Sequence, residues 1–352
     1  MKNLKLINLP ITLSSLLLVS IGILVIYSSS NELALQQIIF TIIGIFFFFL
    51  ISQLELQSLK SLVKPLYIII IIMLVAVFGF GIETRGVLRW FPLGIFSVQP
   101  SEFAKPILIL FLAKFWSEKI PTWQNILRSV FWSAPIFLLI FKQPDLGSAL
   151  TIVAIWMGIL LAAHISIKKV LILALIAMFV IPTSWSFLHS YQKERIINFW
   201  TPESDPLGRG YNLIQSTIAV GSGQLLGRGL GRGTQSRLQF LPEFRTDFIF
   251  ASIAEEMGFL GSVLILSLYL FLLGYCLREA QKTNNSFNLL VIFGVVSMFL
   301  FQVVVNIGMN IGLLPITGIT LPLISYGGSS LISTFFSLGM VASSVKDRVD
   351  PG

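Results

Sequence analysis

The chain has 352 residues, of which 55% are hydrophobic and only 11% are charged. Soluble domains carry about 25% charged residues, so this composition excludes a water-soluble globule and predicts an integral membrane protein, for which lipid is the solvent. We attribute the formal net charge of +8 to loops that face anionic lipid head groups, and we predict no nucleic-acid partner.

Apolar stretches long enough to span a bilayer recur along the chain. They predict helices at 10–30, 34–53, 63–82, 102–116, 127–142, 146–164, 168–188, 247–275, 286–312 and 320–344. The first stretch lacks a small-residue cleavage site, so we interpret it as a retained helix. We expect an all-α integral membrane protein of about ten transmembrane helices, with residues 1–352 forming one polytopic domain.

The distribution of Lys and Arg gives the orientation, because cytoplasmic loops carry an excess of these residues. With a cytoplasmic N-terminus, the cytoplasmic segments hold Lys2, Lys5, Lys60, Lys64, Lys114, Lys119, Arg128, Lys168, Lys169, Arg278, Lys282, Lys346 and Arg348. The short external loops hold only Arg85, Arg89 and Lys142. The sequence therefore predicts a multi-pass membrane protein with both termini cytoplasmic.

Residues 189–246 form a long external loop between the seventh and eighth predicted helices. Loops longer than about 15 residues are usually functional or disordered, and this one is not low in complexity. Its cations are mostly Arg, the side chain that grips phosphate through two parallel hydrogen bonds. A glycine-rich stretch, 221–235, permits the close backbone approach that a diphosphate needs, but it follows no strand, which excludes a nucleotide fold. A merely solvated loop is the alternative.

Ionisable side chains occur where lipid is expected. Glu102 and Lys105 share one face of the fourth predicted helix and can neutralise each other. They form either a structural ion pair or part of a site, since charges inside a span are functional candidates. Asp145 follows a proline at the start of the sixth helix, where capping and catalytic roles are both open.

Asp247 begins the eighth predicted helix, where the basic loop re-enters the membrane. Thr246 or Asp247 is expected to cap that helix. Glu255 and Glu256 lie deeper, and we expect them to hold helices together through polar contacts. Asp247 is the stronger functional candidate, because it lies at the water interface beside the cationic loop.

Several motifs occur in order along the chain: QPSEFAK (99–105), QPDLGSA (143–149), YQKERI (191–196), DPLGRGYNLIQSTIAVGSG (205–223), FLPEFRTDFIFASIAEEMG (240–258) and NIGMNIGLLPITGITLPLISYGGSS (306–330). Together they resemble the SEDS family of peptidoglycan glycosyltransferases, which includes RodA, FtsW and SpoVE. The short termini and NIGM…LLPITG are more similar to RodA, which acts in elongation and cell shape, than to FtsW, which acts in division.

The resemblance implies an enzyme of the bacterial plasma membrane that polymerises lipid II, an undecaprenyl-diphosphate-linked disaccharide peptide, into glycan strands. It also implies a partner transpeptidase, a class B penicillin-binding protein. The family's essential carboxylate falls on Asp247, its buried acid–base pair on Glu102 and Lys105, and the acid of its QPDLG motif on Asp145.

The chemistry needs one general base for the attacking hydroxyl and cations for the departing diphosphate. We assign Asp247 as the catalytic base and Glu102, Lys105 and Asp145 as supporting residues. The residues assigned to the diphosphate or sugar are Arg195, Arg209, Gln215, Ser222, Arg245 and Ser325. A divalent cation, Mg²⁺ or Mn²⁺, could join the arginines. A single Cys and two His provide no cysteine or histidine metal cluster, so metal use stays open.

Two alternative functional hypotheses compete with a glycosyltransferase. A lipid II flippase or transporter would also carry buried acids and bases. The sequence has no evident inverted repeat, however, and its ionisable groups gather at the external face rather than the midplane. A non-catalytic scaffold for a cell-wall complex is compatible with either activity.

Overall fold

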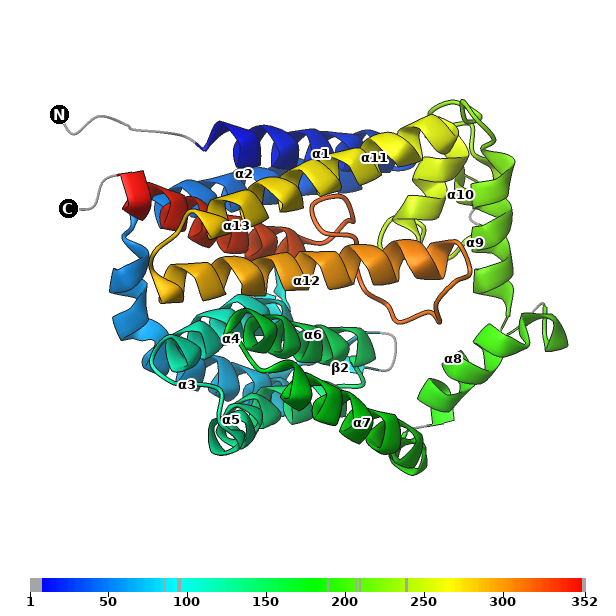
Figure 1. The fold of residues 1–352 in the computed structure, drawn as a ribbon. Helices are drawn as coiled ribbons and strands as arrows, with labels where there is room; N and C mark the ends of the chain where they lie inside the picture. Colours follow the sequence, from blue (N-terminus) through cyan, green and yellow to red (C-terminus); the bar gives the residue numbers. More distant parts are fainter. Residues whose placement is uncertain are drawn as a thin grey trace.

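The computed structural model describes residues 8–84, 87–93, 96–188, 190–206, 208, 210–237 and 240–349. In this part of the chain, long helices lie side by side and make up most of the molecule (Figure 1). They are α1 (Leu9–Tyr27), α2 (Asn31–Gln53), α3 (Leu56–Phe80), α4 (Pro100–Ser117), α5 (Trp123–Lys142), α6 (Leu146–Ala162), α7 (Ile167–Ser184), α11 (Ile249–Gln281), α12 (Ser286–Asn310) and α13 (Gly328–Val349). Each covers one predicted apolar stretch, and seven described helices are long and apolar enough to cross a membrane.

Helix α3 illustrates why these segments become membrane helices. One face is buried against the bundle at helical spacing, through Leu56, Leu59, Val63, Tyr67, Ile70, Leu74 and Val77. The other face is equally apolar but exposed, through Leu62, Ile68, Ile69, Ile72 and Val75. A helix that is apolar on all sides, yet buried on only one, suits a lipid environment.

Helices α12 and α13 form the interior of the bundle. Helix α12 packs against α4, α6, α11 and α13, and α13 packs along α2. Helix α7 differs, because none of its described side chains is buried and it lies at the edge of the bundle (Figure 1). The core therefore consists of helices that are far apart in sequence, with α7 as a loosely packed neighbour.

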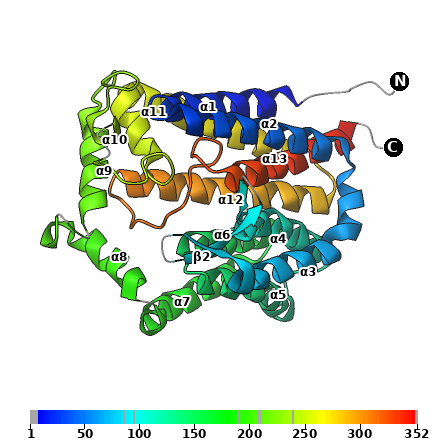
Figure 2. The same ribbon diagram turned by 180° about the vertical axis from the view of Figure 1, so that it is seen from behind.

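The predicted external loop, residues 189–246, is largely helical. Its described part contains α8 (Ser190–Trp200), the 3₁₀ turn η2 (Pro202–Ser204), α9 (Tyr211–Ser222) and the short α10 (Thr234–Arg237), and the turn η1 (Trp185–Phe187) precedes it. These elements lie at one end of the bundle, whereas α1 begins and α13 ends at the other (Figures 1 and 2). The described part of the loop thus forms a cap over one end of the helices.

A small antiparallel sheet, which the sequence reading did not anticipate, lies between α3 and α4. It consists of β1 (Ile82–Thr84), β2 (Val87–Leu93) and β3 (Phe96–Val98) in the order β1-β2-β3. Glu83 pairs with Leu88, and Phe91 pairs with Val98. The short strands turn the chain back toward α4.

Two predicted helix boundaries were wrong. The stretch predicted as 320–344 becomes helical only at Gly328, because residues 311–327 contain prolines and positive φ angles, such as 74° at Gly318 and 69° at Leu323. The stretch predicted from 247 begins at Ile249 and is interrupted at Gly258, where φ is 66° and ψ is −163°. The N-cap residue of α11 is Phe248, and its side chain makes no capping hydrogen bond. Neither Thr246 nor Asp247 therefore caps this helix.

Candidate active site

The carboxylate of Asp247 and the guanidinium of Arg195 approach the same backbone position. Asp247 is half-buried in the turn before α11, and Arg195 lies on α8. Gly318 has no side chain, but a Cβ atom placed there would lie 3.5 Å from Oδ2 of Asp247 and 4.0 Å from Nη1 of Arg195. Gly318 has a φ of 74°, a conformation that glycine adopts without strain. The fold therefore gathers the predicted base and one predicted diphosphate ligand around the 311–327 segment.

Two asparagines of α12 hold the main chain at Asp247. The side-chain amides of Asn306 and Asn310 donate to the backbone oxygen of Asp247 at 2.9 and 3.0 Å. Asn306 also donates to the oxygen of Ile319 at 2.7 Å, and Asn310 accepts from the backbone nitrogen of Ala251 at 3.0 Å. Both asparagines are fully buried. They tie the start of α11 and the 311–327 segment to one rigid helix.

Ser325 holds the other side of the same turn. Its hydroxyl donates to the backbone oxygen of Thr246 at 2.6 Å and accepts from the backbone nitrogen of Leu321 at 2.8 Å. The backbone nitrogen of Tyr326 donates to the oxygen of Arg245 at 2.9 Å. Ser325 is buried, and these bonds give it a structural role next to Asp247. Its contact with substrate stays a prediction.

The guanidinium of Arg245 points toward the end of α1. It donates to the hydroxyl of Ser29 at 2.8 Å and to the backbone oxygen of Ser29 at 3.2 Å. It also lies 4.5 Å from the centre of the Phe244 ring, and burial lowers its pKa from the ordinary value. Several of its donors are therefore already used within the protein, whereas the guanidinium of Arg195 approaches the same position as the Asp247 carboxylate.

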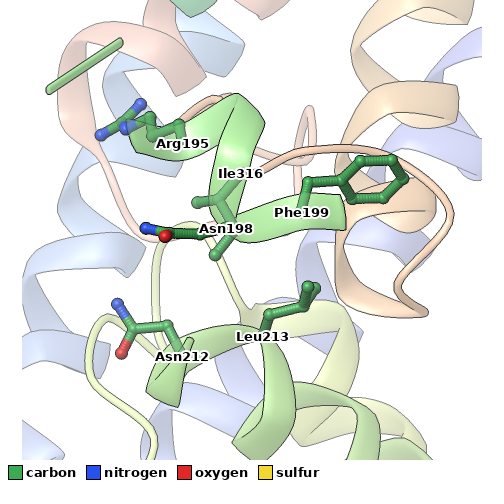
Figure 3. A pocket seen from close by; sticks show the side chains of 6 residues that line it. All are labelled: Arg195, Asn198, Phe199, Asn212, Leu213 and Ile316. Carbon is green, nitrogen blue, oxygen red and sulfur yellow. The ribbon is translucent and has the colours of Figure 1, made fainter. Parts of the chain in front are cut away.

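A pocket of about 130 Å³ lies between α8, α9 and the 311–327 segment. Its lining consists of Arg195, Asn198, Phe199, Asn212, Leu213 and Ile316 (Figure 3). Because Arg195 also approaches Gly318, the pocket adjoins Asp247. Asn198, Phe199, Asn212, Leu213 and Ile316 were not singled out from the sequence.

Asp145 is the N-cap of α6. Its Oδ1 accepts from the backbone nitrogen of Ser148 at 3.1 Å, and its Oδ2 accepts from Nε2 of Gln99 at 3.1 Å and from the hydroxyl of Ser101 at 3.4 Å. Asp145 is buried, so these bonds satisfy its carboxylate. The sequence left a capping and a catalytic role open for Asp145, and the geometry supports the capping role.

The start of α6 packs at Gly147 against the 311–327 segment of the candidate site. A side-chain carbon there would lie 2.6 Å from the Ile319 side chain and 2.9 Å from the backbone oxygen of Thr317. Arg89 of β2 fixes the preceding turn by donating to the backbone oxygen of Gln143 at 2.8 Å and to that of Pro144. The sheet, the QPDLG motif and the 311–327 segment are thus connected.

Glu102 and Lys105 form a buried ion pair on the first turns of α4. Nζ of Lys105 lies 2.7 Å from Oε1 of Glu102, and the two side chains are 3% and 8% exposed, respectively. Within the described part of the chain, this bond joins them to each other rather than to Asp247. The predicted pairing is present, and its proposed influence on Asp247 stays a prediction.

The glycine-rich stretch packs against the interruption of α11. The backbone nitrogens of Arg228 and Gly229 donate to the backbone oxygens of Glu255 and Glu256 at 2.9 and 3.0 Å. A side-chain carbon at Gly227 would lie 2.2 Å from the oxygen of Glu256. Gly227, and Gly223 beside Ala254, therefore serve close contact between two backbones, and this packing explains the absence of a side chain at these two positions.

The two deep acids connect helices, as expected from the sequence. Oε1 of Glu255 accepts from the hydroxyl of Thr234 at 3.1 Å and from the backbone nitrogen of Gln235 at 3.0 Å. The carboxylate of Glu256 accepts from the hydroxyl of Ser28, at 3.0 Å for one of its oxygens. These bonds attach α10 and the end of α1 to α11.

Two further predicted substrate ligands, Gln215 and Ser222, lie on α9. Gln215 is half-buried on this helix, and the hydroxyl of Ser222 donates to the backbone oxygen of Ala219 at 2.9 Å. Arg209 lies outside the described residues. The described residues contain no group of three or more His, Cys, Asp or Glu side chains placed to hold a metal ion, so they do not fit a dedicated metal site.

A family model described as a cell cycle protein, FtsW/RodA/SpoVE, matches residues 4–348. The chain belongs to the FtsW/RodA/SpoVE family. Among relatives of this family, the peptidoglycan glycosyltransferase MrdB of Escherichia coli K12 is 39% identical over 326 residues, covering 91% of this chain and 88% of MrdB. Stage V sporulation protein E of Bacillus subtilis 168 is 38% identical over 355 residues, covering 95% of each chain.

Solved structures show the same fold. A chain from a peptidoglycan synthase complex, studied for the coordination of polymerization and crosslinking, has a TM-score of 0.83 and 34% identity, covering 96% of this chain and 97% of that one. The rod shape determining protein RodA of Thermus thermophilus has a TM-score of 0.75 and 29% identity, covering 99% of both. These findings confirm the predicted multi-span membrane fold, and the chain is a peptidoglycan glycosyltransferase of the FtsW/RodA/SpoVE family.

Proposed function

We propose that this enzyme polymerises lipid II into glycan strands at the outer face of the bacterial plasma membrane, with Asp247 as the catalytic base. The observation that carries the proposal is the approach of the Asp247 carboxylate and the Arg195 guanidinium to one position beside Gly318. A carboxylate next to a cation provides the base and the phosphate-binding charge that glycosyl transfer from a diphosphate requires.

In the proposed reaction, the hydroxyl oxygen of the acceptor sugar attacks the anomeric carbon of the donor sugar. The bond between that carbon and the diphosphate oxygen breaks, and undecaprenyl diphosphate leaves. Asp247 takes the proton of the attacking hydroxyl, and Arg195 stabilises the negative charge of the leaving group. A diphosphate is already a good leaving group, so a second, acidic carboxyl is not required.

The surrounding bonds support such a role for Asp247. Asn306 and Asn310 fix its main chain, and Ser325 fixes the preceding residue. Rigid positioning of a base next to the reacting atoms lowers the cost of reaching the transition state. Among the residues that the structure describes, none form a protein cage for Mg²⁺ or Mn²⁺, so we assign the diphosphate to Arg195 and derive no step from a metal.

The proposed orientation places α8, α9 and α10 outside the cell, with α1 beginning and α13 ending at the cytoplasmic face. The short loops at that face carry the predicted excess of Lys and Arg. The exposed apolar surface of α7, which lies at the edge of the bundle and precedes α8 in the chain, would offer the undecaprenyl chain a lateral path along the protein (Figure 1).

We further propose an elongation role and a class B penicillin-binding protein as partner. The identity of 39% to MrdB, against 36% and 34% to the FtsW proteins of Francisella salina and Trichlorobacter lovleyi, supports elongation rather than division. A structural relative was solved within a peptidoglycan synthase complex, which supports a partnered enzyme.

The test is glycan polymerisation from purified lipid II, with a partner that lacks its own glycosyltransfer domain. We expect polymer from the wild type and at least a hundredfold slower polymerisation by Asp247→Asn, since a general base contributes about 10²–10⁴-fold. Glu203→Gln, which changes an exposed acid in the same cap, is the matched control and should retain full activity. An active Asp247→Asn enzyme would end the assignment. Lipid II transport across proteoliposomes without polymerisation would indicate a flippase.

A further inference from the structure

The pocket between α8 and α9 has a polar wall and an apolar wall. Arg195, Asn198 and Asn212 direct their polar ends to the same side, and the aliphatic side chains of Leu213 and Ile316 lie beside them (Figure 3). The ring of Phe199 extends away from the two carboxamides (Figure 3). Such a mixed lining is typical of sites that bind small polar groups carrying an apolar part.

The two asparagines are available for a ligand. Asn198 and Asn212 are both half-buried, and neither side chain has a hydrogen-bond partner among the residues that the structure describes. A half-buried amide without a partner in the protein is open to water or to a ligand. A carboxamide offers both donor N–H groups and an acceptor oxygen, so the two carboxamides together match a ligand that also offers one donor and one acceptor.

The size of the pocket limits the ligand. A complete small-molecule site occupies about 300–1,000 Å³, whereas this pocket has about 130 Å³. It therefore accommodates a substituent rather than a disaccharide. An acetamido group fits this chemistry, because its N–H and C=O match the carboxamides and its methyl group matches Leu213 and Ile316.

We propose that this pocket binds the 2-acetamido group of the sugar attached to the diphosphate, held by Asn198 and Asn212. The inference rests on the proposed function and names a subsite of the same enzyme. Arg195 lines the pocket and also reaches the position beside Asp247. A sugar whose acetamido group occupies the pocket would thus place its diphosphate at Arg195 and its anomeric carbon near Asp247.

The experiment measures equilibrium binding of two lipids to the detergent-solubilised full chain. The first is undecaprenyl diphosphate, which has no sugar, and the second is undecaprenyl-diphosphate-linked N-acetylmuramyl peptide. Asn198→Ala/Asn212→Ala should bind the second lipid about ten- to a hundredfold more weakly, because each neutral hydrogen bond corresponds to about three- to tenfold. Binding of the first lipid should stay within twofold. Asn284→Ala, at an exposed asparagine between α11 and α12, is the matched control.

A deacetylated form of the second lipid completes the test. Removing the acetyl group should weaken binding to the wild type by a similar factor and should not weaken binding to the double variant further. Wild-type affinity of the variant for both lipids, or an equal loss for both, would overturn the subsite. Polymerisation of lipid II by the same wild-type preparation separates that result from a failure of the proposed function, in which no polymer would form.

Discussion

Asn310 binds the main chain on both sides of the first turn of α11, and one of its partners is the backbone oxygen of Asp247. Its amide nitrogen donates to that oxygen at 3.0 Å, and its amide oxygen accepts from the nitrogen of Ala251 at 3.0 Å. The residue that carries the carboxylate is therefore fixed by a buried side chain of another helix. Because α12 lies in the interior of the bundle, the position of Asp247 depends on the packing of the whole core.

Replacing Asn310 by Leu should lower kcat by about tenfold or more and also lower thermal stability. The change leaves the oxygen of Asp247 with one donor fewer and the nitrogen of Ala251 without its partner, and an unsatisfied buried group costs about 1–3 kcal/mol. Polymerisation kinetics and thermal unfolding of the purified variant measure the two effects.

Gln302→Leu, two turns earlier on α12, is the control. Gln302 is also buried, but its Oε1 has no hydrogen-bond partner in the described part of the chain. Its replacement should change kcat by less than threefold. An equal loss of kcat in the two variants would show that replacing any buried amide of α12 lowers activity. That result would contradict a specific positioning of Asp247 by Asn310.

Arg195→Gln should weaken binding of undecaprenyl diphosphate about ten- to a hundredfold, which corresponds to one charge-assisted hydrogen bond. Arg228→Gln should change it by less than twofold. The Arg228 guanidinium is exposed and donates to the hydroxyl of Thr234 at 2.9 Å, away from Asp247. Direct binding measurements test whether Arg195 contributes specifically. If the cations of the cap contribute only through their general charge, both variants will bind undecaprenyl diphosphate more weakly to the same extent.

The buried pair of Glu102 and Lys105 should show opposite outcomes for single and double substitutions. Lys105→Met alone leaves a buried carboxylate without its cation and should cost about 3–5 kcal/mol of stability, whereas Glu102→Leu/Lys105→Met should recover most of it. If the pair also positions Asp247, the stable double variant will polymerise lipid II more slowly than the wild type. Full activity of that variant would reduce the pair to a structural contact.

Gly258→Ala should detach the glycine-rich stretch from α11. The φ of 66° and ψ of −163° at Gly258 are accessible essentially to glycine alone, and an added side-chain carbon would lie 2.3 Å from the nitrogen of Gly227. We expect lower thermal stability and faster proteolysis within 223–233. Gly221→Ala, on the last turn of α9 with nothing within 4 Å, should be neutral or slightly stabilising. Equal proteolysis of the two variants would contradict the packing role of Gly258.

The site was only partly predictable from the sequence. Glu102 and Lys105 were singled out because charges inside a membrane span are unusual. Asp247 was singled out because it lies beside the cationic loop that contains Arg195, and the motifs of all four residues resemble the SEDS family. Asn306 and Asn310 were missed, although two amides four residues apart on an apolar helix lie on one face and indicate a buried polar contact. Asn198 and Asn212 gave no such signal, since isolated asparagines in a polar loop are ordinary.

The sequence by itself determined the membrane environment and the long helices, because apolar runs of spanning length depend only on local composition. Only the tertiary structure decided that the described part of 189–246 forms helices over one end of the bundle, that 311–327 stays non-helical, and that the side chains of Asp247 and Arg195 approach the same position beside Gly318. Those features depend on contacts between residues far apart in the chain. Their energies come from close packing and from satisfying buried polar groups, which no local pattern specifies.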